Sequence, residues 1–104
     1  MTIVDDKAIG KYLDSAVDKI FKILPLYEEK NETLDEYIES LILELRGFVS
    51  EYGNVGVTDY ISVISTLEGI RDMASDRGNQ PKIKREVFKC IEIIKKVRNM
   101  LEGA

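Results

Sequence analysis

Residues with catalytic chemistry are scarce in this 104-residue sequence, and each absence excludes a class of function. The chain contains no histidine and one cysteine. Without histidine it lacks the commonest general base at neutral pH and the commonest metal ligand, and it cannot form a Ser-His-Asp or Cys-His arrangement. A single cysteine, Cys90, cannot form an internal disulfide, which favours a reducing compartment.

Long apolar runs are missing too. No stretch approaches the ~18 uninterrupted apolar residues that a membrane span needs. Asp5 and Asp6 bring charge into the region where a secretory signal would be apolar. We therefore expect a cytoplasmic protein without membrane association. Two prolines among many Glu, Lys and Ile residues are typical of a bacterial protein.

Glycine-rich phosphate-binding motifs are absent as well. The segment Gly53-Asn54-Val55-Gly56 is short and is not followed by the G-K-[ST] of a P-loop. The dinucleotide fingerprint and the alternating strands that accompany it are also missing. The sequence therefore gives no indication of a bound nucleotide cofactor.

What the chain does contain is apolar residues at helical spacing. Hydrophobic residues make up 44% of the sequence and charged residues 33%, a balance that supports one folded core. The apolar residues recur every three or four positions in four segments. The pattern predicts an all-α single domain over residues 1–104, an antiparallel bundle of four helices at about 5–24, 34–52, 59–75 and 81–102.

Pro25 marks the end of the first segment. Proline lacks a backbone donor and disfavours helical geometry in the residue before it, so we expect the helix to end or kink at Leu24. Residues 25–32 can continue a kinked helix or form a separate turn. A three-helix core with one docked helix remains an alternative.

The other helix boundaries are signalled by short motifs. Thr33 and Glu36 have the spacing of a capping box, and Gly53 stands where a left-handed C-terminal cap belongs. Thr58 can cap the third helix, and Pro81 suits the first position of the fourth. Thr33, Glu36 and Gly53 thus mark both ends of the second helix.

The apolar stripes also predict which side chains face inward. Cys90 lies on the inward stripe of the fourth segment, which indicates a buried structural thiol rather than a nucleophile. In the third segment the inward stripe is formed by Tyr60, Ile61, Ile64, Leu67, Ile70 and Ala74.

One acidic cluster suggests metal chemistry. Glu28, Glu29 and Glu32 have an E-E-x-x-E spacing that resembles all-helical nucleotide pyrophosphohydrolases of the MazG type. That resemblance implies a second E-x-x-D motif on the next helix to hold magnesium, but the counterpart beginning at Glu44 has Gly47 in place of the second acid. A carboxylate-metal nucleotide hydrolase is thus one alternative, and a solvated acidic loop is the other. We predict no enzyme, no metal and no cofactor.

Charge is distributed unevenly along the chain. The net charge is −4, yet residues 81–104 carry seven basic and three acidic side chains. These bases predict a basic face on the fourth helix. Such a face indicates an alternative function, nucleic-acid binding, in which the fourth helix contacts phosphates. Attraction to the acidic second helix is the structural alternative. The basic face comprises Lys82, Arg85, Lys89 and Lys96, and the acids of the second helix are Asp35, Glu36, Glu39 and Glu44.

The apolar stripes of the second and third helices are broad and include aromatic residues. Tyrosine at a stripe edge is usually a core side chain, but it is also enriched at protein interfaces. We predict a non-enzymatic protein–protein interaction or regulatory module that presents helix faces to a protein partner or to a second copy of itself. The candidate partner-binding residues are Tyr37, Phe48, Tyr52, Tyr60 and Val63.

Overall fold

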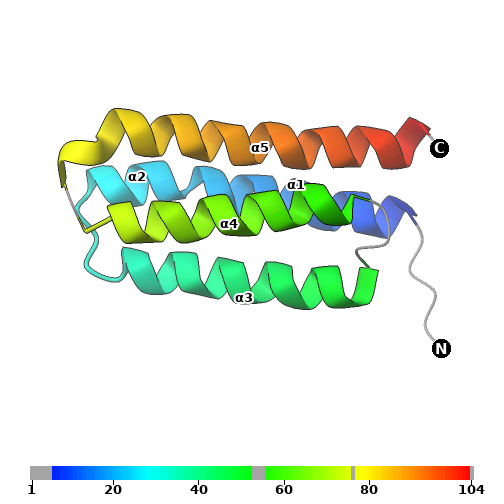
Figure 1. Ribbon diagram of the computed structural model, residues 1–104, viewed down its shortest axis with the longest axis horizontal. Coiled ribbons are helices and arrows are strands. Elements are labelled where there is room, and N and C mark those ends of the chain that lie inside the picture. The colour runs from blue at the N-terminus through cyan, green and yellow to red at the C-terminus, as the bar shows by residue number, and fades with distance from the viewer. Residues whose placement is uncertain (1–5, 53–55, 76, 104) are drawn as a thin grey trace.

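The computed structural model confirms the all-α bundle and describes residues 6–52, 56–75 and 77–103. Four antiparallel rods lie side by side, and the first rod is broken into two helices (Figure 1). A short 3₁₀ turn, η1, precedes the last rod. The elements are α1 (Asp6–Phe21), α2 (Ile23–Glu28), α3 (Leu34–Tyr52), α4 (Val57–Met73), η1 (Arg77–Asn79) and α5 (Gln80–Gly103).

The four rods are not equally close to one another. α5 packs along α1, α2 and α4, whereas α3 packs mainly along α4. α3 and α5 therefore lie on opposite sides of the bundle (Figure 1). Among the rods that adjoin, α1 and α3 have the more widely separated backbones, and large rings fill that seam: Tyr12 stacks on Phe48 with ring centroids 4.3 Å apart.

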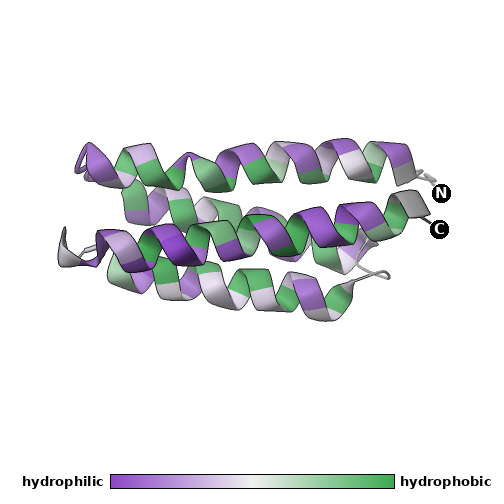
Figure 2. Ribbon diagram, turned by 90° about the horizontal axis from the view of Figure 1, so that it is seen from above, coloured by the Kyte–Doolittle hydropathy of each residue, from purple (hydrophilic) through white to green (hydrophobic). Residues whose placement is uncertain are grey.

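The core is apolar throughout the described residues, where no charged side chain is buried. Each rod contributes fully buried side chains, for example Ile20, Ile38, Leu67 and Ile94. Hydrophobic and hydrophilic residues alternate along each helix, as the period of 3.6 residues requires (Figure 2). None of the described helices has the length and apolar character needed to cross a membrane.

The first rod breaks earlier than the sequence predicted and continues further. α1 ends at Phe21, and α2 runs through Pro25 to Glu28 instead of ending at Leu24. The break lies at Lys22 because the proline ring and its missing N–H disrupt the bond that residue 25 would make to the carbonyl of residue 21. Helical bonding resumes at once, since Leu26 N–H donates to Lys22 O at 3.2 Å.

α3 spans Leu34–Tyr52, which are the predicted bounds. The capping box is not formed, however. The Thr33 hydroxyl donates to Asn31 Oδ1 at 2.7 Å, and the same oxygen accepts the Thr33 N–H at 2.8 Å. A polar turn before the helix thus replaces the predicted side-chain cap, and Gly53 lies outside the described residues.

The ends of α4 and α5 also differ from the prediction. α4 begins at Val57 rather than residue 59, because Gly56 takes the N-cap position with φ = 81°, so Thr58 lies inside the first turn. This backbone conformation suits glycine, and a Cβ there would lie 3.1 Å from Val97. α4 ends at Met73, two residues early, and α5 extends the predicted range by one residue at each end.

Candidate functional site

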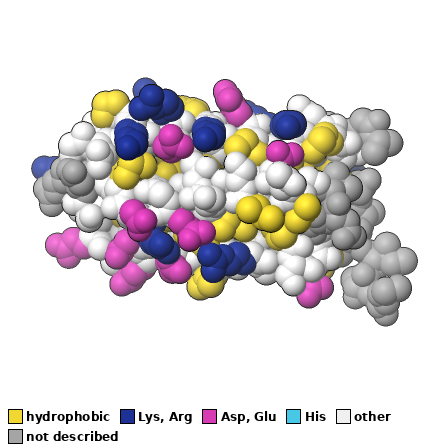
Figure 3. All heavy atoms as spheres, viewed as in Figure 1, with side chains coloured by type: hydrophobic (Ala, Val, Ile, Leu, Met, Phe, Trp, Pro, Cys, Tyr) yellow, Lys and Arg dark blue, Asp and Glu magenta, His cyan; other side chains and the backbone are white. Residues whose placement is uncertain are grey.

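The outward side of α4 carries apolar and small side chains where a bundle helix ordinarily carries charge. Val57, Ile61, Ser65 and Gly69 follow one another at four-residue spacing, and all four are exposed. Val57 and Ile61 expose 45% and 58% of their surface. We call these four residues the α4 face. In Figure 3 it lies in a band over the middle of the molecule that is largely free of charged side chains.

This face arises because the inward side of α4 is already filled. The sequence placed Ile61 on the inward stripe, which is wrong: Tyr60 and Ile64 are buried, while Ile61 points outward. At about 100° per residue, the buried residues of α4 share one side of the helix, and residue 61 falls outside that side. The buried residues of α4 are Tyr60, Val63, Ile64, Leu67 and Ile70.

A basic edge runs along α5 beside the α4 face. It consists of the four predicted bases Lys82, Arg85, Lys89 and Lys96, all exposed and spaced along one side of the helix. Lys96 Nζ lies 3.7 Å from Asp59 Oδ1 of α4, which places the edge on the α4 side of α5. Basic side chains gather along the upper border of the band in Figure 3. Two acids, Glu86 and Glu92, lie among the bases on the same helix.

The predicted attraction between the basic helix and the acidic α3 is not found. α5 packs against α1, α2 and α4, and α3 lies on the opposite side of the bundle. The basic helix instead forms ion pairs with its own neighbours: Lys96 with Asp59, and Arg98 Nε with Asp14 Oδ1 of α1 at 2.6 Å. Within the described residues, the ion pairs do not include Lys82, Arg85 or Lys89.

An acidic edge borders the α4 face on its other side. Arg46 Nη2 of α3 lies 3.2 Å from Glu68 Oε1 of α4, and Arg71 of α4 pairs with Glu39 of α3. These pairs hold α3 against α4 and use two of the acids there. We define the acidic edge as Asp35, Glu39, Glu68 and Asp72.

The five aromatic and apolar residues predicted to bind a partner lie mostly inside the bundle. Phe48, Tyr60 and Val63 expose 8%, 2% and 0% of their surface, so they cannot present a surface to a partner in the folded chain. Tyr37 is half-buried, and its hydroxyl donates to the backbone oxygen of Lys19. Tyr52 is 38% exposed. The structure brings three of the five together, because Phe48 lies 5.6 Å from both Tyr52 and Tyr60 between ring centroids.

The spacing of apolar residues in the sequence therefore did not identify Val57 and Ile61 as exposed. The signal that could have found the α4 face is its composition, since residues 57–69 combine serine, threonine and glycine with only two acids and no base. A second exposed pair, Phe21 and Phe88, lies across the α1–α5 seam with ring centroids 6.2 Å apart. Those two rings cover part of each other across the seam.

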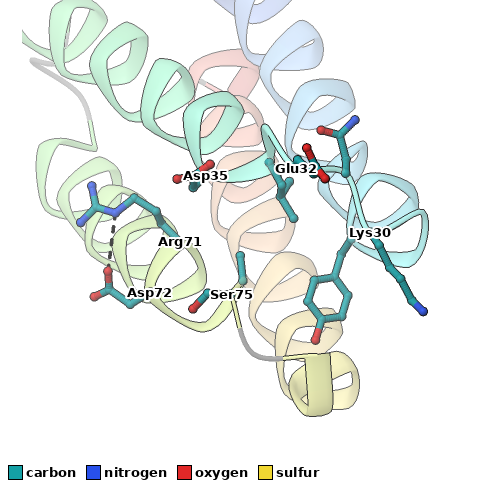
Figure 4. Close-up of a pocket in the computed structure, with 10 residues that line it drawn as sticks. Lys30, Glu32, Asp35, Arg71, Asp72 and Ser75 are labelled. Atoms are coloured by element: carbon teal, nitrogen blue, oxygen red, sulfur yellow. Dashed lines mark ion pairs between the residues drawn. The ribbon is translucent and has the colours of Figure 1, made fainter.

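A pocket of about 560 Å³ lies at the end of the bundle where α2 turns into α3. Asp35, Arg71 and Asp72 lie on one side of it, with Arg71 Nε 3.6 Å from Asp72 Oδ1 (Figure 4). Lys30 points away from this group on the other side. Because its walls combine charges of both signs, the pocket favours neither an anion nor a cation.

The acidic cluster of residues 28–32 does not converge on a metal-binding geometry. Glu28 Oε1 accepts a hydrogen bond from Gln80 Nε2, and Glu44 lies elsewhere, in an ion pair with Lys19. No three histidine, cysteine or acidic side chains within the described ranges are grouped as metal ligands. Within the described residues, the structure thus does not bring together the acids that the carboxylate-metal hypothesis requires.

Cys90 is fully buried, as the sequence predicted. Burial, together with the nearby carboxylate of Glu86, raises the pKa of the thiol to about 12. Its Sγ lies 3.9 Å from the backbone oxygen of Val63 on α4. A buried, protonated thiol is a poor nucleophile, so the side chain serves the packing of α4 on α5.

Comparison of the chain with protein-family models, with curated proteins and with solved structures found no match. Its function is therefore inferred from its surfaces.

Proposed function

We propose that this chain is a non-enzymatic protein–protein interaction module that presents the α4 face to a protein partner or to a second copy of itself. The observation that carries the proposal is the exposure of Val57 and Ile61 on an uncharged helix side. Such a module suits regulatory or assembly roles. A lone buried thiol is consistent with a reducing, cytoplasmic setting.

The physical support lies in the exposed apolar side chains of Val57 and Ile61 on the outer side of α4. A helix on the outside of a bundle gains solubility from a charged outer face, and apolar residues there leave surface that a partner can bury. The two flanking edges add specificity, because charged rims align a partner and exclude others of the wrong sign. A basic edge and an acidic edge border the same α4 face (Figure 3).

Affinity capture with two matched arginine variants tests the proposal. Ser65→Arg places a long charged side chain in the α4 face, and Ser15→Arg places the same side chain on the exposed outer side of α1. The tagged wild-type chain and Ser15→Arg should retain the same partner from a lysate of the source organism, or an untagged copy of the chain. Ser65→Arg should lose it, because burying an unpaired charge at an interface is costly.

Equal retention by all three proteins, or by none, would contradict the proposal. Circular dichroism of both variants checks that the bundle is folded. Each serine is exposed and lies within a helix, so the two substitutions carry a similar cost to the fold.

Nucleic-acid binding through the basic edge is the second candidate function. Exposed Lys82, Arg85 and Lys89 favour it, because such side chains contact phosphates. The net charge of −4 opposes it. The same capture experiment separates the two candidates, since nuclease treatment removes a nucleic-acid partner and leaves a protein partner bound.

A further inference from the structure

We infer that the partner of the α4 face is a second copy of this chain, related by a two-fold axis parallel to the helices. The inference rests on the proposed function and names its partner. It follows from how the two charged edges are placed relative to the α4 face.

The α4 face lies between edges of opposite sign. α4 packs against α5 on one side and against α3 on the other. The ion pair of Lys96 with Asp59 marks the basic side, and that of Arg46 with Glu68 marks the acidic side. Figure 3 shows the same order: basic side chains along α5, an uncharged band, and acidic side chains toward one end of α3 and α4.

The two edges also match along the length of the bundle. α3 and α5 begin at the end of the molecule where α4 finishes (Figure 1). Asp35 is the second residue of α3, Asp72 is the last but one of α4, and Lys82 is the third of α5. Arg85 follows one turn later. Asp35 and Asp72 therefore lie at the same level as Lys82 and Arg85, whereas Lys96, paired with Asp59, lies toward the other end.

These placements select one orientation for a symmetric dimer. A two-fold interface uses the same surface of both copies. Rotation about an axis parallel to the helices sets the basic edge of each copy against the acidic edge of the other, at the same level and twice over. Rotation about an axis across the helices would set basic on basic and acidic on acidic, which costs energy.

The α4 face allows two α4 helices to approach in this orientation. The position of a Cβ on Gly69 meets no heavy atom within 4 Å, so that end of the face is open. Val57 and Ile61 would bury their exposed surface against the same residues of the second copy. Small side chains at positions 65 and 69 permit a close crossing of the two helices.

The charges facing the second copy balance in favour of attraction. The acidic edge carries four acids against the neighbouring Arg46 and Arg71. The basic edge carries four bases against Glu86 and Glu92 of the same helix and Asp59 of α4, which pairs with Lys96. Each edge therefore keeps an excess of its own sign, and the contact is attractive on both sides of the axis.

Sedimentation velocity of the purified chain at concentrations up to about 1 mM tests the inference. The wild type and Ser15→Arg should reach twice the chain mass of 11.8 kDa. Ser65→Arg should weaken self-association by about tenfold or more, because its charge is buried at the axis without a partner. Raising the salt concentration should weaken the wild-type dimer.

Two charge-reversal variants test the orientation. Lys82→Glu/Arg85→Glu makes both edges acidic, and Asp35→Lys/Asp72→Lys makes both edges basic, so each protein alone should be a monomer. Their equimolar mixture should form a heterodimer, because all facing edges then have opposite signs. Loss in each protein alone with recovery on mixing shows that an edge of one copy faces the opposite edge of the other.

A cysteine variant provides a check that does not depend on charge. In the parallel dimer Gly69 of one copy lies near Gly69 of the other, so Gly69→Cys should form an interchain disulfide with an added oxidant. Ser15→Cys should not. Buried Cys90 is present in both proteins and acts as a constant background.

Three results would overturn the inference. They are a wild type that remains monomeric, a dimer that Ser65→Arg leaves intact, or a mixture of the reversal variants that fails to associate. If the wild type is monomeric but its capture of another protein is lost in Ser65→Arg, the proposed function stands and the second copy is excluded as the partner. If capture fails as well, both are overturned.

Discussion

The Tyr37 hydroxyl completes the backbone hydrogen bonding of a different helix. It donates to the Lys19 carbonyl at 2.7 Å, and that carbonyl lies one turn before the break at Lys22. Carbonyls near a break lose their helical partners, so a side-chain donor there has structural value. Burial, with the nearby carboxylate of Glu44, raises the pKa of Tyr37 and keeps the hydroxyl protonated as a donor.

We predict that Tyr37→Phe lowers the free energy of unfolding by about 0.5–1.5 kcal/mol, the net value of one intramolecular hydrogen bond. The ring and its packing are kept, so only the donor is lost. Urea unfolding followed by circular dichroism measures the change. Tyr52→Phe, at a more exposed tyrosine of the same helix, is the control, and an equal effect in both variants would refute the role of the hydroxyl.

At the scale of the element, the first rod shows how a proline is accommodated inside a helical segment. Pro25 is the third residue of α2, where the N–H groups of a helix have no partner within that helix. The missing donor therefore costs α2 little. The break costs the rod some regular hydrogen bonding, and Ile23 and Tyr27 of α2 are both buried in the core.

We predict that Pro25→Ala lowers the free energy of unfolding by about 0.4–1 kcal/mol, because alanine restores conformational freedom to the unfolded chain. Val17→Pro, in the middle of α1, is the contrasting variant and should cost about 3 kcal/mol. Both values come from denaturant midpoints and slopes. A stabilising effect of Pro25→Ala would show that the break is strained rather than accommodated.

Helix boundaries were predictable where a stop signal and an apolar pattern coincide. α3 has the predicted ends because its stripe begins and stops sharply. α4 begins at Val57 because Gly56 adopts a left-handed conformation, and nothing in the sequence marks that glycine as the cap rather than Thr58. The first break lies at Lys22, one turn before Pro25, because the proline disrupts the bond to the carbonyl of residue 21; the expected end at Leu24 considered only the residue next to the proline.

At the scale of the whole molecule, the sequence determined the number of rods but not their neighbours. Four amphipathic segments imply one core, yet their spacing does not say that α3 and α5 are diagonal partners. The four bases of α5 are exposed and lie along one edge, because helical spacing alone places them on one side of the helix. The α4 face was not foreseen, since Ile61 could be assigned outward only once Tyr60 and Ile64 were known to be buried.

The uncharged core predicts how stability depends on pH. Burial raises the pKa of both Tyr60 and Cys90 to about 12, from 10.0 and 9.0. The folded chain thus holds these protons more tightly than the unfolded chain does. The stability due to these groups is fully present below about pH 9 and is lost as the pH rises toward 12.

We expect the free energy of unfolding to fall between pH 9 and 12 and to fall less in Tyr60→Phe, which has no phenol to ionise. Urea unfolding at a series of alkaline pH values measures both slopes. Tyr52→Phe is again the control, because Tyr52 lies outside the core. Identical slopes in all three proteins would exclude Tyr60 as a contributor.

The burial of Cys90 also means that the rate at which its thiol is labelled reports how often the α4–α5 junction opens. The chain has one sulfhydryl, and it lies against the Val63 carbonyl at the junction of α4 and α5. A thiol reagent can reach it only when those two helices part. The rate at which reagent is consumed therefore counts opening events at this junction. A second copy bound over α4 would make these opening events rarer. Binding of a partner would therefore slow the labelling of Cys90.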